Sequence, residues 1–150
     1  LGSRSPVYRD ANVVIHIVEG HDKFRAAIDF LLKHIDAGRI AAITSELTLA
    51  EVLVRPIRDG DQERVRAFES LLTDTPQFRI VPVHRGIMRR SAELRATFGG
   101  SLPDAIHAAS AEASACKLFL SEDRRVRLPG DLAASNLIEF ASALAGLFQR

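Results

Sequence analysis

The sequence predicts an α/β fold in three layers, an α/β/α sandwich around a mostly parallel central sheet of four to five strands. Short apolar runs, typical of buried parallel strands, alternate with amphipathic stretches of about ten or more residues. The chain has 150 residues, 47% hydrophobic and 26% charged, which suffices for one ordinary globular core. We expect a single domain over residues 7–150 and a disordered end or expression scar over residues 1–6.

The predicted strands are short apolar runs bounded by turn or helix signals. The third run contains Pro82, which has no N–H for a ladder, so we expect this strand at an edge of the sheet. The pattern does not give the order of the strands. The runs cover residues 7–10, 39–44, 78–83, 117–120 and 136–140.

Helices are predicted between these runs from apolar residues at helical spacing. Asn12 and Ser45 are the expected N-caps of two helices, because their side-chain oxygens can accept from free backbone N–H groups. The helix after Ser45 is expected to stop before Pro56, and Gly38 and Gly99 end two others. The predicted helices cover residues 13–18, 22–37, 46–55, 62–72, 85–98, 101–115 and 142–148.

Composition excludes several classes of protein. Cys116 is the single cysteine, which rules out an intramolecular disulfide and a multi-cysteine metal site and is compatible with a reducing, cytoplasmic location. No apolar run approaches the ~18 residues that span a bilayer, so no membrane association is expected. The net charge of +1 neither demands nor excludes a nucleic-acid partner.

Four carboxylates stand where chemistry is expected in such a sheet. Asp10 ends the first strand, Glu51 lies in the helix after the second, and Asp123 comes just after the fourth. The carboxyl ends of parallel strands share one edge, where ligands bind, so these three can converge. Asp104 begins a helix with no obvious strand before it, and its placement at that edge is less secure.

Clustered carboxylates repel one another, and a divalent cation relieves that repulsion. Hard oxygen ligands suit Mg²⁺ or Mn²⁺, which activate water for displacement at phosphorus. Each residue also has a plain structural interpretation. Asp104 with Ser101 fits a capping box, Asp123 lies in a charged loop, and Asp10 can simply end its strand. Glu51 is the hardest to explain this way, because it lies on an apolar helix face.

The four carboxylates lie in four short segments of the chain. The segments are residues 10–15 (DANVVI), 44–53 (TSELTLAEVL), 102–111 (LPDAIHAASA) and 119–124 (FLSEDR). Together they resemble the motifs of PIN-domain ribonucleases, most closely the VapC-type toxins of bacterial toxin–antitoxin pairs. Each segment is similar to one family motif, and their order and spacing match across nearly the whole chain.

This resemblance implies a metal-dependent endoribonuclease with a Mg²⁺ or Mn²⁺ site. Asn12 and Ser121 would be supporting polar residues that orient the carboxylates or a bound water. It also implies an RNA substrate, a homodimer and a small antitoxin that inhibits the site. The metal ligands and catalytic residues would be Asp10, Glu51, Asp104 and Asp123.

The chain departs from the family pattern just before and after Asp123. Glu122 replaces the usual Asn, and Arg125 stands where an acidic residue is common. Arg124 and Arg125 are candidate contacts to RNA phosphates, with a solvated loop as the alternative. His107, one turn after Asp104, is expected to be a packed helix residue rather than a ligand.

Two other functions stay open at this stage. One is a catalytically silent α/β binding module that uses the same cleft, and the other is a stand-alone PIN nuclease that is not a toxin. An aspartyl-phosphate enzyme is disfavoured, because Asn12 stands where the partner acid of Asp10 would be. Glycine-rich nucleotide-binding loops of the usual types do not occur.

Overall fold

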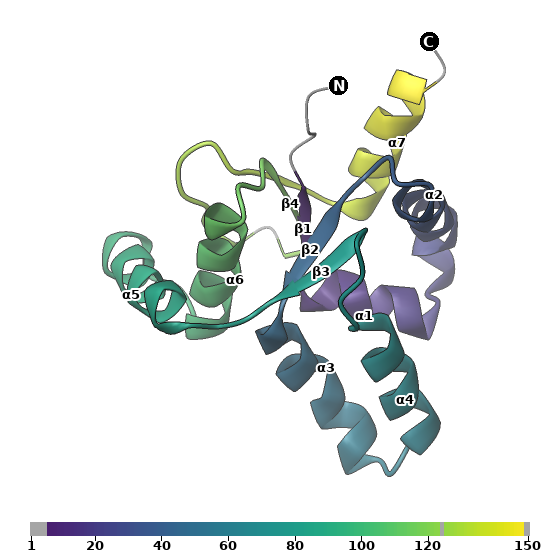
Figure 1. The fold of residues 1–150 in the computed structure, drawn as a ribbon, viewed down its shortest axis with the longest axis horizontal. Coiled ribbons are helices and arrows are strands. Elements are labelled where there is room, and N and C mark those ends of the chain that lie inside the picture. The colour runs from purple at the N-terminus through teal and green to yellow at the C-terminus, as the bar shows by residue number, and fades with distance from the viewer. Residues whose placement is uncertain (1–5, 124, 149–150) are drawn as a thin grey trace.

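A computed structural model of the chain describes residues 6–123 and 125–148, so most of the predicted N-terminal scar lies outside the described residues. Its centre is a five-stranded, wholly parallel sheet in the order β3-β2-β1-β4-β5 (Figure 1). The predicted mostly parallel sheet and the edge position of β3 are confirmed. The strands are β1 (Val7–Arg9), β2 (Ala42–Ser45), β3 (Phe78–Val81), β4 (Leu118–Leu120) and β5 (Ala133–Ser135).

Helices cover both faces of this sheet, which gives the three predicted layers. Figure 1 shows α5 and α6 on one side of the sheet and α2 and α7 on the other. Val7 and Leu120 pack toward α2 and α7, whereas Tyr8 and Phe119 pack toward α6. The helices are α1 (Ala11–Glu19), the 3₁₀ turn η1 (Asp22–Phe24), α2 (Arg25–Asp36), α3 (Glu46–Arg58), α4 (Gln62–Leu71), α5 (Arg85–Phe98), α6 (Leu102–Ala113) and α7 (Leu137–Phe148).

The helices α1, α3 and α4 gather beyond the carboxyl ends of the strands, as Figure 1 shows. Val14, Val52 and Phe68, one from each helix, form a small buried core there. The α3–α4 hairpin therefore forms one wall of the edge where the predicted site lies. None of the described helices is both long and apolar enough to cross a membrane.

Three sequence predictions about individual elements are wrong. Asp10, not Asn12, caps α1, because the Asp10 side chain accepts from the Val13 N–H at 3.2 Å and Asn12 is exposed. The helix α3 runs through Pro56 to Arg58, and Pro56 is buried in the last turns of the helix although it has no N–H to donate.

The third wrong prediction is the strand over residues 136–140. The Asn136 side chain accepts from the Glu139 N–H at 2.8 Å and so begins α7, which absorbs the apolar residues that follow. The fifth strand lies just before it, at residues 133–135. Its Ala-Ala-Ser sequence carries no strand pattern, so parallel pairing with β4 decides its conformation.

Candidate active site at the carboxyl edge of the sheet

The strand order reverses between β1 and β4, and this is the place where a parallel α/β sheet opens a crevice. Asp10 follows β1 directly, and Ser121 follows β4 directly. The two strand ends are tied together, because the Asp10 backbone N–H donates to the Leu120 carbonyl at 3.2 Å. Two polar side chains that are 111 positions apart (121 − 10) thereby become neighbours.

Asp10 is a buried carboxylate at this crevice, with 7% of its surface exposed. Burial raises the pKa of Asp10, which the hydrogen bonds from Ser121 and the Val13 N–H partly offset. The nearby His107 also lowers the pKa of Asp10, and the nearby Glu51 raises it. Asp10 therefore has Ser121, His107 and Glu51 around it, and its negative charge is poorly compensated.

Glu51 reaches this crevice from α3 and is held there by α6. Its Oε1 lies 2.5 Å from Nε2 of His107, and Nδ1 of the same ring lies 2.6 Å from the Tyr8 hydroxyl. His107 is 3% exposed and Tyr8 is fully buried, stacked against Phe119. Burial raises the pKa of Tyr8, so the hydroxyl keeps its proton. Glu51 is thus one end of a chain of hydrogen bonds anchored in the core.

Asp123 has a different kind of partner. Its backbone N–H donates to the Ser121 hydroxyl at 3.0 Å, and its carboxylate accepts from Nε and from the backbone N–H of Arg125. These hydrogen bonds lower the pKa of Asp123. The Ser121 side chain contacts both Asp10 and Asp123.

Asp104 lies in the first turn of α6, where its backbone N–H donates to the Ser101 hydroxyl at 3.2 Å. The expected Ser101 cap is therefore present. Asp104 lines a small hollow of about 50 Å³ together with Arg125 and Arg127, and its charge acts on Arg125. The predicted carboxylates thus form two groups, one around His107 and one around Arg125.

The two groups are not joined into one set of ligands. Among residues 6–123 and 125–148, no three His, Cys, Asp or Glu side chains stand close enough together to hold a metal ion. The donors nevertheless fit Mg²⁺ or Mn²⁺ in kind, because all are carboxylates and Asp10 is buried without a compensating cation. The exposed Arg125 guanidinium, at 91%, supplies positive charge to Asp123 in this arrangement.

His107 is packed, as the sequence predicted, but its hydrogen bonds to Glu51 and Tyr8 and the contact that Glu122 makes were not predicted. The His107 side chain joins Glu51 to the core, and its position one turn after Asp104 was the available signal. Glu122 accepts from the Leu137 N–H at 3.0 Å at the start of α7. Arg124, a predicted phosphate contact, lies outside the described residues.

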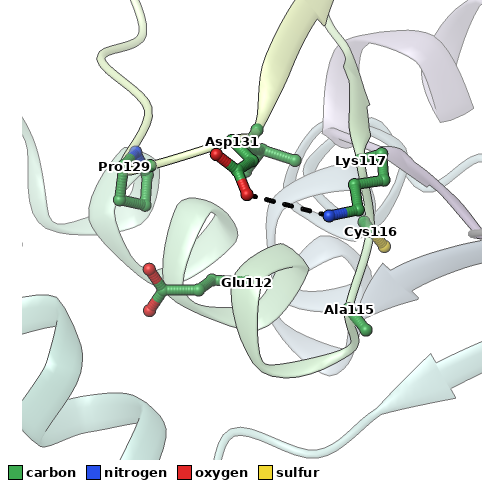
Figure 2. Close-up of a pocket in the computed structure, with 8 residues that line it drawn as sticks. Glu112, Ala115, Cys116, Lys117, Pro129 and Asp131 are labelled. Atoms are coloured by element: carbon green, nitrogen blue, oxygen red, sulfur yellow. Dashed lines mark ion pairs between the residues drawn. The ribbon is translucent and has the colours of Figure 1, made fainter.

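A second hollow, of about 320 Å³, lies at the opposite, amino end of β4 (Figure 2). Lys117 and Asp131 form an exposed ion pair across it at 3.8 Å. Burial raises the pKa of the Cys116 thiol to about 12, which leaves it a poor nucleophile. The carboxylates at the other edge are the stronger candidates for chemistry.

A parallel sheet with buried and half-buried acids at its switch point defines the general class, an α/β protein with a polar site at the carboxyl edge. The family model of the PIN domain matches residues 7–131 of this chain. The chain therefore belongs to the PIN domain family. Members of this family are generally nucleases, which hydrolyse phosphodiester bonds.

Solved structures share the fold at low sequence identity. A toxin–antitoxin complex from Klebsiella pneumoniae has 23% identity and a TM-score of 0.58, covering 81% of this chain and 89% of that chain. VapBC2 from Rickettsia felis, bound to a DNA fragment from its promoter, has 14% identity and a TM-score of 0.66, covering 87% and 97%.

PAE2754 from Pyrobaculum aerophilum has 18% identity and a TM-score of 0.64, covering 95% of this chain and 90% of that chain. No curated protein matches the chain in sequence. At these identities the structural likeness establishes the fold, and the function must be argued from the site.

Proposed function

We propose that this PIN-domain protein is a Mg²⁺- or Mn²⁺-dependent endoribonuclease and the toxin of a toxin–antitoxin pair. The observation that carries the proposal is the state of Asp10. It is a buried carboxylate at the switch point of the sheet, its pKa is raised, and Glu51 adds to its repulsion. The cap of α1 needs only a side-chain oxygen at this position and not a buried negative charge, whereas a cation site requires the charge.

In this proposal Asp10, Glu51, Asp104 and Asp123 are the residues that would hold the cation. Ser121 supports them, because its hydroxyl contacts both Asp10 and the backbone of Asp123. When bound, the cation activates water and stabilises negative charge on the attacked phosphodiester. One of these carboxylates can also accept the proton of the attacking water.

In this proposal the basic loop after Asp123 binds the RNA backbone. The exposed side chain of Arg125 lies next to the carboxylates, and Arg127 lines the same hollow as Asp104. Tyr8, the single tyrosine, is fully buried, and the chain has no tryptophan, so little aromatic surface is available for stacking on bases. Recognition of a folded RNA by its shape follows from this composition.

The toxin role and the partners rest on the family and its structural neighbours. Two of the similar structures are described as a toxin–antitoxin complex and as VapBC2. We propose a cognate antitoxin as inhibitor, a homodimer as the state in solution and the cytoplasm as the location. A stand-alone PIN nuclease is the second candidate, because the same site would serve both.

The test is cleavage of total RNA by the purified protein with Mg²⁺ or Mn²⁺, and again with EDTA. We expect discrete products that need the metal and that Asp10→Asn reduces by more than about 100-fold, because even outer partners of a metal site are worth about 10–100-fold. Asn keeps the cap of α1, since asparagine and aspartate cap helices equally well.

Two results would contradict the proposal. Cleavage by Asp10→Asn at the wild-type rate would show that Asp10 is not part of the active site. An absence of metal binding in calorimetry would favour the catalytically silent binding module. Light scattering of the same sample measures the proposed dimer. Inhibition by a co-encoded small protein separates the toxin from a stand-alone nuclease.

A further inference from the structure

His107 is a buried, hydrogen-bonded residue that is not among the proposed metal ligands. It lies on α6 with 3% of its surface exposed, in the one stretch of that helix where every residue from Ala105 to Ala111 is buried. Its neighbours Ala108 and Ala109 pack with the α5 side chains in one buried cluster, and Ala111 packs with Tyr8 and Phe119 of the sheet in another. The imidazole ring is therefore fixed by packing as well as by its hydrogen bonds.

Both ring nitrogens of His107 are hydrogen-bonded, one toward the core and one toward the site. The Tyr8 hydroxyl lies 2.6 Å from Nδ1, and Oε1 of Glu51 lies 2.5 Å from Nε2. Because a carboxylate can only accept, Nε2 carries the proton in the hydrogen bond to Glu51, and in the neutral ring Nδ1 then accepts from the Tyr8 hydroxyl. The contact with Tyr8 thus orients the ring so that Nε2 faces the carboxylate.

We propose that His107, oriented by Tyr8, is a positioning residue that holds Glu51 by one carboxylate oxygen and leaves the other oxygen for the cation. The inference rests on the proposed metal-dependent function of the same site. It adds a residue that the four-carboxylate motif does not contain, and it explains how α6 contributes to the site beyond carrying Asp104.

The alternative is that Glu51 serves only as a hydrogen-bond acceptor for the buried His107 ring. The surroundings of Glu51 favour the positioning role. The Glu51 side chain is 32% exposed, so water could solvate it without His107. Holding a long glutamate side chain in one conformation costs rotamer entropy. A ligand that is fixed before the cation arrives does not have to lose this freedom on binding.

A matched pair of amides tests the proposal. In His107→Gln the side-chain nitrogen reaches the position of Nε2 and can still donate to Glu51, whereas in His107→Asn the amide reaches only the position of Nδ1. Both variants bury one amide, so a merely structural role predicts similar losses in thermal stability and in function. Calorimetry with MnCl₂ on the full chain gives the affinity, and thermal unfolding in EDTA gives the stability.

We expect His107→Asn to weaken Mn²⁺ binding by about 10–100-fold and His107→Gln to stay near the wild-type affinity. Tyr8→Phe, which removes only the hydroxyl, should weaken binding in the same direction as His107→Asn. If His107→Asn and His107→Gln have the same stability and bind Mn²⁺ with the same affinity, the proposal for His107 is wrong. The proposed nuclease function is not affected by that result. A wild-type protein that binds no Mn²⁺ would instead overturn the proposed function, and the inference with it.

Discussion

At the scale of single residues, the ionisation of Asp10 works against folding. Because burial raises its pKa, the folded chain holds this proton to a higher pH than the unfolded chain, whose aspartates titrate near ~3.9. The free energy of unfolding therefore falls as pH rises from that value through the raised pKa. We expect Asp10→Asn to melt at a higher temperature than the wild type at pH 7 in EDTA, with the difference gone below about pH 3.5. A lower melting temperature for the variant at pH 7 would show that the charge is compensated.

Arg125 sets the ionisation of Asp123 in the opposite direction. Its side chain and backbone N–H groups lower the pKa of that carboxyl, so Arg125→Ala should raise it toward the ordinary value. Carboxyl NMR titration measures the change. We also expect Arg125→Ala to bind Mn²⁺ more tightly, because the guanidinium no longer competes for Asp123. Arg127→Ala removes the same charge from the same loop, and an equal effect there would point to general electrostatics instead.

At the scale of elements, helix caps place two of the proposed ligands. The Ser101 hydroxyl accepts from the Asp104 N–H, and Ser45 caps α3, which carries Glu51. We expect Ser101→Ala to lower the free energy of unfolding by about 1 kcal/mol and to impair cleavage, because the turn that carries Asp104 loses its cap. Urea unfolding measures the first effect. Ser101→Thr, which retains a capping hydroxyl, is the control. Equal stability of the wild type and both variants would show that the cap does not contribute to stability.

Elements with a long periodic pattern could be predicted from the sequence, and elements decided by pairing could not. Residues 85–98 form α5 as predicted, because a helical repeat and a terminal glycine act within one segment. β5 is extended only because β4 lies beside it, which no local pattern in Ala-Ala-Ser encodes. The candidate acids could be named, since Asp10 and Asp123 follow predicted strands and Glu51 and Asp104 lie near the starts of predicted helices. The histidine between Tyr8 and Glu51 could not, because both of its partners are distant in sequence.

At the scale of the whole molecule, metal binding should be visible as stability. A ligand that binds only the folded state at 100 times its Kd adds ~2.7 kcal/mol, and in a domain of this size each kcal/mol raises Tm by ~2–4 °C. We therefore expect saturating Mn²⁺ to raise the Tm of the wild type by roughly 5–11 °C. Asp10→Asn should show little of this rise. An equal rise in both proteins would mean that Mn²⁺ binds elsewhere on the chain.

The central position of β1 has a consequence for how the protein is made. Its second neighbour in the sheet, β4, begins only at Leu118, so one side of β1 stays unpaired until β4 has been synthesised. Asp10 is synthesised before Asp123, and strands β2, β3 and β4 and helices α1 to α6 lie between them in the chain. A nascent chain that ends before Asp123 consequently lacks one of the proposed ligands, so the proposed activity begins only after that residue has been added.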